Sequence, residues 1–407
     1  MAASSPAPAV RRAVLWVPDW PVAAAVLEGL LDVAAPAAIH DQRGILVASA
    51  AARRAGVTTG MRRRVAQGLC PELTLLPADP VRDARSFEPL IQAAETVVAE
   101  VEVLRPGLLV MPARGPARYL GSEEALAEEL VGAVADETGV ECQVGVADGL
   151  LAAVLAARDG ILVPTGAGPE YLAGQDVGAL AHATAGRAAV AEIADLVDLL
   201  RRLGLRRLGD LAALDAGDVA ARLGGVGLRA RHLARGGDER PPAGSRPEED
   251  VQAQVDLDPP AERSDRAAFA ARALAEQLAE RLLRRGAACG RLRVRARTED
   301  GAELTRTWLL DGPASAAELT DRVRWQLDGW LAGRSGAAPS APLTRLELLA
   351  LEVGPAGVVQ DGLWGRARRG ELQAGRAALR VQGMLGPDGV LVPVLQGGRD
   401  PRSRARL

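Results

Sequence analysis

The stretch Ala13–Leu30, AVLWVPDWPVAAAVLEGL, predicts how the fold begins. Its apolar run Val14–Val17 is closed by a proline, which is typical of a short buried strand. Trp20 then opens an alanine-rich segment that predicts a helix, with Asp19 as its N-cap and Pro21 in its first turn. We therefore expect a buried strand that leads directly into a helix, and the rest of the chain to be built around this unit.

Length and composition indicate a globular protein with several domains. The chain has 407 residues, 48% of them hydrophobic, and a net charge of −3, which predicts about two to four domains. No apolar run reaches the roughly 18 residues of a membrane span, and the N-terminus does not have the pattern of a signal peptide. Cys70, Cys142 and Cys289 are far apart and form no CxxC pair. We therefore expect a protein of the reducing cytoplasm.

The chain contains no lysine, and this excludes two kinds of chemistry. A phosphate-binding loop of the Walker A type and Schiff-base catalysis both require a lysine amine. His40, His182 and His232 are isolated from one another and from the cysteines, so they show no zinc-ligand spacing. The arginine bias fits GC-rich codon usage, but arginine also binds phosphate well, so contact with nucleic acid is compatible with it.

A run of glycines and arginines after a predicted hairpin at residues 39–47 is the most specific pattern in the chain. It continues as SAAARRAGVTTGM and a short helix that ends at a Cys-Pro pair. The residues that define the pattern are Arg53, Gly56, Val57, Gly60, Met61, Cys70 and Pro71. Their spacing resembles the fingers of the Y-family (translesion) DNA polymerases. In that family a tyrosine and an arginine hold the triphosphate of the nucleotide. Here Ala50 replaces the tyrosine and Arg53 remains, as a remnant of the clamp or as a solvated helix residue.

The resemblance also locates the positions at which Y-family polymerases carry their metal-binding acids. The Asp-x-Asp pattern of the first strand falls on Trp16 and Pro18. The later Ser-x-Asp-Glu pattern places its serine at Arg105 and its two acids at Gly107 and Leu108. Mg²⁺ requires oxygen ligands, which these side chains do not supply. The resemblance therefore implies no catalytic residue, no bound metal and no other cofactor.

Three segments should complete the N-terminal part. Ser86–Glu102 predicts one amphipathic helix, and 122–138 predicts another with Ser122 as its N-cap. CQVGVADGLLAAVLAA predicts a strand followed by a helix. In the family this last segment carries two lysines that contact the nucleotide phosphates, and Leu150 and Val154 replace them here.

The segment Leu196–Gly237 alternates short helices with glycine turns and resembles the helix-hairpin-helix thumb of the same family. Such hairpins offer backbone N–H groups to a DNA phosphate. The segment is locally basic, and the residues we expect to face DNA are Arg206, Arg207, Arg229 and Arg231. The polar, proline-rich stretch that follows, DERPPAGSRPEED, predicts a linker.

A small α+β domain is predicted from Val251 to about Val353, in the order strand, helix, two strands, helix and strand, with a row of arginines in one of its strands. Because successive residues of a strand point to opposite faces, the row should occupy one face. Its members are Arg291, Arg293, Arg295 and Arg297, and Arg281, Arg284 and Arg285 precede them with no acid in the span. Such a row suits the repeating phosphates of a nucleic-acid strand. The alternative is an edge strand protected by charges.

The peptide QDGLWG follows this domain and resembles the pentapeptide with which bacterial polymerases bind the sliding clamp. Leu363 and Trp364 would fill an apolar pocket on the clamp, and Gln360 would make polar contacts at its rim. The alternative is that Trp364 packs on its own domain. The tail after this peptide is basic.

The resemblance covers about residues 10–400 and implies an α+β multi-domain fold of the Y-family type. The expected parts are a palm and fingers-like region at 1–190 (fingers at about 39–80), a helix-hairpin-helix thumb at 191–237, a linker at 238–250, a little-finger domain at 251–355, and the clamp-binding peptide with a basic C-terminal tail at 356–407.

The best match within the family is its catalytically inactive ImuB branch, which acts in bacterial damage-induced (SOS) mutagenesis. It implies a non-catalytic adaptor in the nucleoid that binds damaged DNA and the sliding clamp (beta subunit). The adaptor would recruit an error-prone replicative-type DNA polymerase and a RecA-like accessory protein. One alternative is an active translesion polymerase with displaced acids, for which the candidates are Asp19, Glu28, Glu100 and Glu102. Another is a DNA-binding protein without clamp or polymerase partners.

Overall fold

The computed structural model describes residues 10–184, 187–237, 251–310, 314–331, 339, 341–355, 394–395 and 405–406. Within these ranges, no helix is long and apolar enough to cross a membrane. The expected linker and the expected clamp-binding peptide lie outside the described residues.

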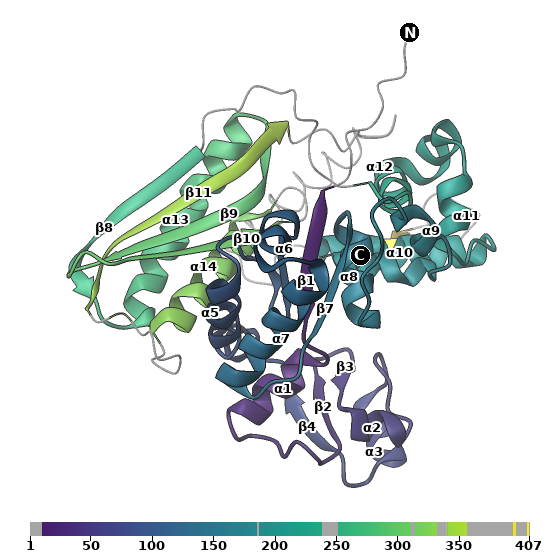
Figure 1. The fold of residues 1–407 in the computed structure, drawn as a ribbon, viewed down its shortest axis with the longest axis horizontal. Coiled ribbons are helices and arrows are strands. Elements are labelled where there is room, and N and C mark those ends of the chain that lie inside the picture. The colour runs from purple at the N-terminus through teal and green to yellow at the C-terminus, as the bar shows by residue number, and fades with distance from the viewer. Residues whose placement is uncertain are drawn as a thin grey trace.

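A single eight-stranded sheet runs through the N-terminal and C-terminal parts of the chain (Figure 1). In spatial order its strands are β7 (Gln143–Asp148), β1 (Arg11–Trp16), β6 (Leu108–Pro112), β5 (Glu102–Arg105), β10 (Glu303–Leu309), β9 (Ala287–Thr298), β11 (Leu343–Pro355) and β8 (Val251–Ala261). All neighbours are antiparallel except β5 and β10, which are parallel. The first strand predicted from the sequence is therefore β1, and it lies inside the sheet.

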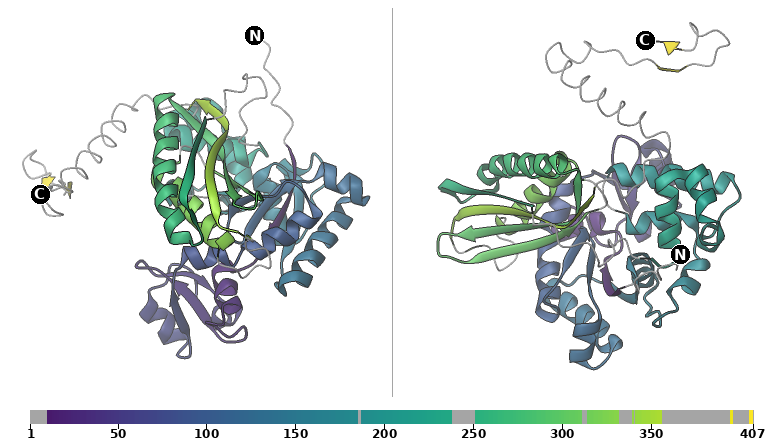
Figure 2. Two further views of the ribbon diagram at one scale, coloured as in Figure 1. Left: turned by 90° about the vertical axis from the view of Figure 1, so that its left-hand side faces the viewer. Right: turned by 90° about the horizontal axis from the view of Figure 1, so that it is seen from above.

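Helices cover the two faces of this sheet differently. One apolar cluster joins a first face to α5, α7, α13 and α14, and Figure 2 shows α13 lying along the strands of the C-terminal part. The helices of this layer are α5 (Glu88–Val97), α7 (Glu123–Thr138), α13 (Ser264–Arg284) and α14 (Ala316–Leu331). They are flanked by α4 (Pro80–Arg85) and α6 (Arg114–Leu120).

A helical region packs on the opposite face of β1, β6 and β7 through a second apolar cluster. It consists of α8 (Leu150–Asp159), α9 (Gly168–Ala173), a 3-10 helix at Val177–Ala183, α10 (Arg187–Arg202), α11 (Leu208–Ala213) and α12 (Ala216–Ala234). Gly224 has φ 64°, a backbone conformation that glycine adopts more easily than other residues. It divides α12 into two pieces. The expected domain boundary at residue 190 falls inside α10.

A three-stranded sheet with order β3-β2-β4 forms a separate small unit. It contains β2 (Ala37–His40), β3 (Ile45–Ala48) and β4 (Thr74–Pro77), with α1 (Trp20–Leu27), α2 (Ala50–Arg54) and α3 (Arg63–Leu69) beside it. The hairpin predicted at residues 39–47 is confirmed as β2 and β3. Gly44 is required there, because a Cβ atom would lie 2.5 Å from the carbonyl oxygen of Met61.

Two sequence predictions of local structure were wrong. The helix expected over Ser86–Glu102 ends at Val97, and the chain is extended at Val98, with φ −130° and ψ 121°. β-Branched residues there favour extended backbone. Asp19 occupies the predicted N-cap position of α1, but its side chain does not make the expected capping hydrogen bond.

Other predictions of local structure are confirmed. The Ser122 hydroxyl accepts a hydrogen bond from the Ala125 N–H at the start of α7. The C-terminal part has the predicted order of strand, helix, two strands, helix and strand. The short strands β12 (Val394–Leu395) and β13 (Ala405–Arg406) pair with each other.

Candidate nucleic-acid interface

The positions that the resemblance assigns to metal-binding acids meet at the end of β1. Trp16 lies directly opposite Leu108 in the β1–β6 register. Gly107 precedes Leu108, and its carbonyl accepts a 2.9 Å hydrogen bond from the Val17 N–H. Gly107 has φ +87°, and a Cβ atom there would lie 2.5 Å from the Cβ of Trp20. The side chains at these positions, an indole, a hydrogen and an isobutyl group, supply no oxygen ligand for a metal.

A basic side chain contacts Trp16. The Arg158 guanidinium lies 4.4 Å from the centroid of the Trp16 ring, in a cation–π contact. Burial lowers the pKa of this half-buried arginine. Arg105 Nη1 donates a 2.8 Å hydrogen bond to the His182 carbonyl. Burial, followed by the charges of Arg158 and Arg105, lowers the pKa of His182 to about 4. At neutral pH the imidazole is therefore uncharged, while Asp159 and Asp19 lie near enough to oppose the effect of burial on the pKa of Arg158.

Arg53, which the resemblance predicts to be a remnant of a nucleotide-phosphate clamp, forms an ion pair with Asp19. Arg53 Nη1 lies 2.6 Å from Asp19 Oδ2 and also donates to the Ala48 carbonyl at 2.5 Å. The ion pair joins α2 of the small sheet unit to the loop after β1. It engages the carboxylate of Asp19, the acid nearest to Trp16 in the sequence. A ligand phosphate would have to displace Asp19 to take the hydrogen bond that Nη1 donates to it.

The other displaced acids are also placed away from a common site. Glu28 Oε1 accepts hydrogen bonds from Arg85, and Glu102 pairs with Arg291 at 2.6 Å. Glu100 is exposed in the loop before β5. Across the part of the chain that the structure describes, no three His, Cys, Asp or Glu side chains are grouped so that they could hold a metal ion.

The arginine row lies on one face of β9, as the alternation predicts, but it is not uniformly available. Arg291 is buried between Glu102 and Glu352, so its role is structural. The exposed fraction of the side chain rises along the strand to 37% at Arg295 and 53% at Arg297. Arg293 is half-buried, and its Nε donates to a threonine hydroxyl on β10.

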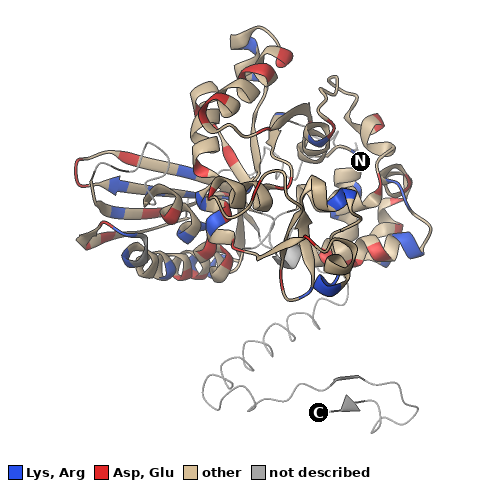
Figure 3. Ribbon diagram, turned by 90° about the horizontal axis from the view of Figure 1, so that it is seen from below, with Lys and Arg blue, Asp and Glu red and all other residues tan. Residues whose placement is uncertain are grey.

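Acids on neighbouring strands balance the row, which the sequence reasoning did not anticipate. Arg295 pairs with Glu347 of β11 at 3.0 Å, and Arg297 pairs with Glu303 of β10 at 3.3 Å. Figure 3 shows basic and acidic segments interspersed over this sheet. A phosphate would compete with partly exposed carboxylates, and such exposed pairs contribute little to stability.

The arginine row and Trp16 lie on the same face of the continuous sheet. Trp16 and Val14 pack with the helical region, and so does Leu309 of β10. Leu309 is the register partner of Arg291 on β9, and directly opposed residues share a face. The row therefore lies on the sheet face against which α8 and the helical region pack, whereas α13 and α14 pack against the other face.

The arginines that precede the row lie elsewhere. Arg284 and Arg285 are exposed at the C-terminal end of α13 and line a surface pocket together with Arg281 and the start of β8. Arg281 donates to the Gln252 carbonyl. The seven arginines expected to act together are thus divided between the strand face and the end of a helix.

The thumb-like arginines also differ in availability. Arg206 and Arg207 are exposed before α11, and their backbone N–H groups donate to the Asp210 carboxylate. Arg229 and Arg231 are half-buried, and Arg231 Nε donates to the Leu214 carbonyl at 2.6 Å. Arg206 and Arg207 are therefore the more accessible pair.

Comparisons with known proteins give one family match and several similar sequences. Residues 23–158 match the family described as impB/mucB/samB. Two relatives are both named DNA polymerase IV. The one from Methanoculleus marisnigri is 34% identical over 206 residues, which are 48% of this chain and 54% of the relative. The one from Halorhodospira halophila is 28% identical over 208 residues, which are 49% of this chain and 55% of the relative. The chain spans about half the length of these two relatives.

A solved structure described as DinB from Sulfolobus solfataricus is 16% identical, with a TM-score of 0.45 over 84% of this chain and 98% of that one. The structure itself, with one large mixed sheet, a small sheet unit and a helical region, has an α+β fold in several parts.

Sequence reasoning missed Arg158 and the acids opposite the row. Arg158 lies one helical turn after Val154, which replaces a family lysine, so helix periodicity could have drawn attention to it. The acids Glu303 and Glu347 could have been found by writing the predicted strands in antiparallel register.

Proposed function

We propose that this chain is a non-catalytic, polymerase-like adaptor of the ImuB type, which binds DNA and the sliding clamp and recruits an error-prone polymerase. The observation that carries the proposal is the pairing of Trp16 with Leu108 at the end of β1. In-line phosphoryl transfer by this family depends on carboxylate-bound metal ions. The proposal is supported by the indole ring at position 16, which lies against the Arg158 guanidinium and supplies no carboxylate oxygen.

The arrangement of basic side chains supports DNA as the ligand. Arg293, Arg295 and Arg297 line one sheet face, and the helical region with Arg206 and Arg207 stands on the same side of that sheet. Phosphates contacted by arginines from both parts would fix the register of a duplex without reading its sequence. In this proposal, residues 1–190 form the palm and fingers, 191–237 the thumb and 251–355 the little finger.

The DNA arm of the proposal is tested by fluorescence anisotropy with a labelled primer–template over a range of salt concentrations. Arg295→Gln with Arg297→Gln should weaken binding roughly tenfold and reduce the salt slope by about 2, since each lost phosphate contact removes about 0.9. The matched control is Arg266→Gln with Arg272→Gln, two exposed arginines on α13, which should bind like the wild type. Equal losses in both double variants would argue against the strand face.

The clamp arm is tested by surface plasmon resonance with an immobilised sliding clamp. Trp364→Ala should abolish clamp binding and leave the DNA affinity unchanged, because an extended peptide loses its apolar anchor. Undiminished clamp binding by this variant would remove Gln360, Leu363 and Trp364 from the proposal.

The alternative function is an active translesion polymerase. The names of the two relatives, DNA polymerase IV, favour it. The two functions differ in one activity, the extension of a primer in the presence of a divalent metal.

A further inference from the structure

The N-terminal and C-terminal parts meet edge to edge at β5 and β10. The parallel register contains two pairs, Thr307 with Glu102 and Trp308 with Val103. The paired strands are about 200 residues apart in the sequence. A contact with so few backbone pairs would be easy to open if nothing else held it, because each hydrogen bond adds little net stability.

A buried polar network crosses this junction. Arg306 of β10 and Glu88 of α5 have side chains that are 3% and 2% exposed, and Arg306 Nη2 lies 2.6 Å from Glu88 Oε1. Arg306 also pairs with Glu95. Gln326 of α14 donates from Nε2 to Glu88 Oε2 at 3.0 Å and accepts from Trp308 Nε1 at 3.2 Å. Buried charges must be paired to be tolerated, so this network admits one relative placement of the two parts.

Two more groups of ion pairs bridge the same parts at the rim. Arg85 of α4 binds Glu28 on the N-terminal side and Asp328 of α14 on the C-terminal side, at 2.5 and 3.2 Å. On the opposite face of the sheet, Arg291 of β9 pairs with Glu102 of β5. The junction is thus tied on both faces of the sheet.

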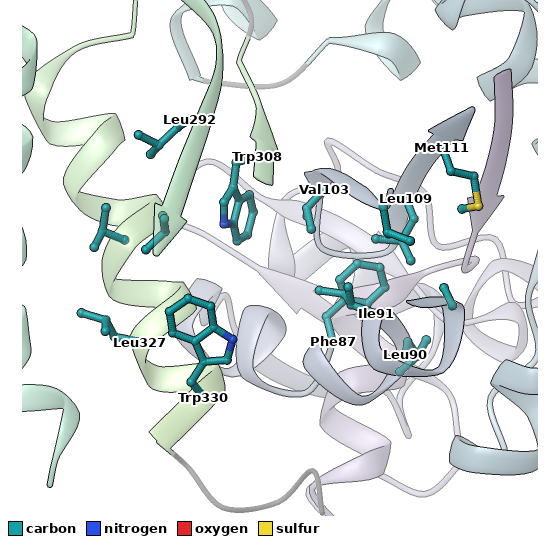
Figure 4. Packing of buried hydrophobic residues seen from close by; sticks show 14 of the residues in the cluster. Phe87, Leu90, Ile91, Val103, Leu109, Met111, Leu292, Trp308, Leu327 and Trp330 are labelled. Carbon is teal, nitrogen blue, oxygen red and sulfur yellow. The ribbon is translucent and has the colours of Figure 1, made fainter. Parts of the chain in front are cut away.

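Apolar packing is continuous across the junction. One cluster contains Phe87 and Val103 from the N-terminal part together with Trp308 and Trp330 from the C-terminal part. Figure 4 shows these side chains side by side beneath the sheet. Buried apolar contact of this kind supports cooperative behaviour of the two parts.

We propose that the network of Glu88, Glu95, Arg306 and Gln326 is a latch that holds the C-terminal α/β part against β5 in one orientation. The latch keeps the arginine row on the same side as Trp16 and the helical region. When its charges are removed, the two-pair strand contact, the remaining ion pairs and the apolar packing still hold the two parts together but allow a wider range of relative orientations. The proposal does not depend on DNA binding or on the proposed function.

The test is a distance measurement by pulsed electron paramagnetic resonance. Spin labels are attached at Glu129→Cys on α7 and Gln277→Cys on α13, both exposed, after replacement of the native cysteines by alanine. The wild-type junction should give one narrow distance distribution. Glu88→Gln with Arg306→Met removes both buried charges together and should widen the distribution about twofold or more.

The matched control is Arg345→Met, which removes an exposed ion pair with Asp256 within the C-terminal part. It should leave the distribution narrow. A broad distribution in the wild type, or a narrow one in the latch variant, would overturn the proposal. If the latch variant does not fold by circular dichroism, Glu95→Gln decides, because it removes the partly exposed carboxylate of the same network. Widening by that variant supports the latch, and a distribution of wild-type width overturns it.

Discussion

Replacing Gly145 with alanine should displace α8 from the sheet. A Cβ atom on Gly145 would lie 1.9 Å from the Ala157 nitrogen and 2.3 Å from the Ala156 carbonyl carbon. Both are backbone atoms, so no side-chain rotation can relieve the overlap. Since ordinary contacts begin at 3.4 Å, α8 would have to move away from β7 by about 1.5 Å.

The cost should reach the upper end of that for overpacked cores, about 3 kcal/mol. Seven residues of α8 are buried, and Arg158, which follows them in the same helix, stacks on Trp16. Urea unfolding, followed by circular dichroism and tryptophan fluorescence, should therefore show a lower midpoint and altered native fluorescence.

Gly132→Ala is the matched control, because nothing lies within 4 Å of the Cβ position in the middle of α7. It should stabilise the protein by up to about 1 kcal/mol, since alanine has the higher helix propensity. Equal midpoints for Gly145→Ala and the wild type would refute the close approach of α8 to β7.

Three further outcomes follow from particular side chains. Arg158→Gln removes the cation–π contact with Trp16 and should lower the free energy of unfolding by about 1 kcal/mol in a urea titration. An unchanged free energy of unfolding would show that the contact is absent in solution. Burial raises the pKa of Asp83 to about 6. Because the folded value exceeds the unfolded one, Asp83 contributes stability that is present below about pH 4 and is lost as the pH rises through 6. The free energy of unfolding of Asp83→Asn should accordingly rise relative to that of the wild type between about pH 4 and pH 7. A constant difference between the two free energies would contradict the raised pKa. Burial raises the pKa of Cys142 to about 11 and that of Cys289 to about 12, so both thiols should react with Ellman's reagent at pH 8 only after unfolding, and fast reaction of the native protein would show that they are accessible.

Local sequence signals predicted the elements whose causes are local. Ser122 marks the start of α7, and the left-handed Gly139 follows its end. The alternation of Arg293 and Arg295 with apolar residues predicted a strand with one basic face. At Asp19 the same local reasoning was wrong, because its carboxylate binds Arg53, 34 residues away, instead of capping α1.

Interactions between distant segments could not be predicted in this way. Nothing near Arg306 in the sequence indicates that it is buried against Glu88, 218 residues earlier. Likewise, the burial of Arg291 depends on Glu102 of a strand in the other half of the chain. The basic row was predicted from one strand, but its accessibility depends on how four strands come together.

Primer extension tests the central claim most directly. The purified chain is incubated with a primed template and all four nucleotides in Mg²⁺ and, separately, in Mn²⁺, beside a Trp16→Ala, Arg105→Ala double variant as background. If the strand ends around Trp16 and Leu108 hold no catalytic metal, the wild type will add no more nucleotides than the double variant in either metal. Extension by the wild type above that background would contradict the account and favour an active translesion polymerase.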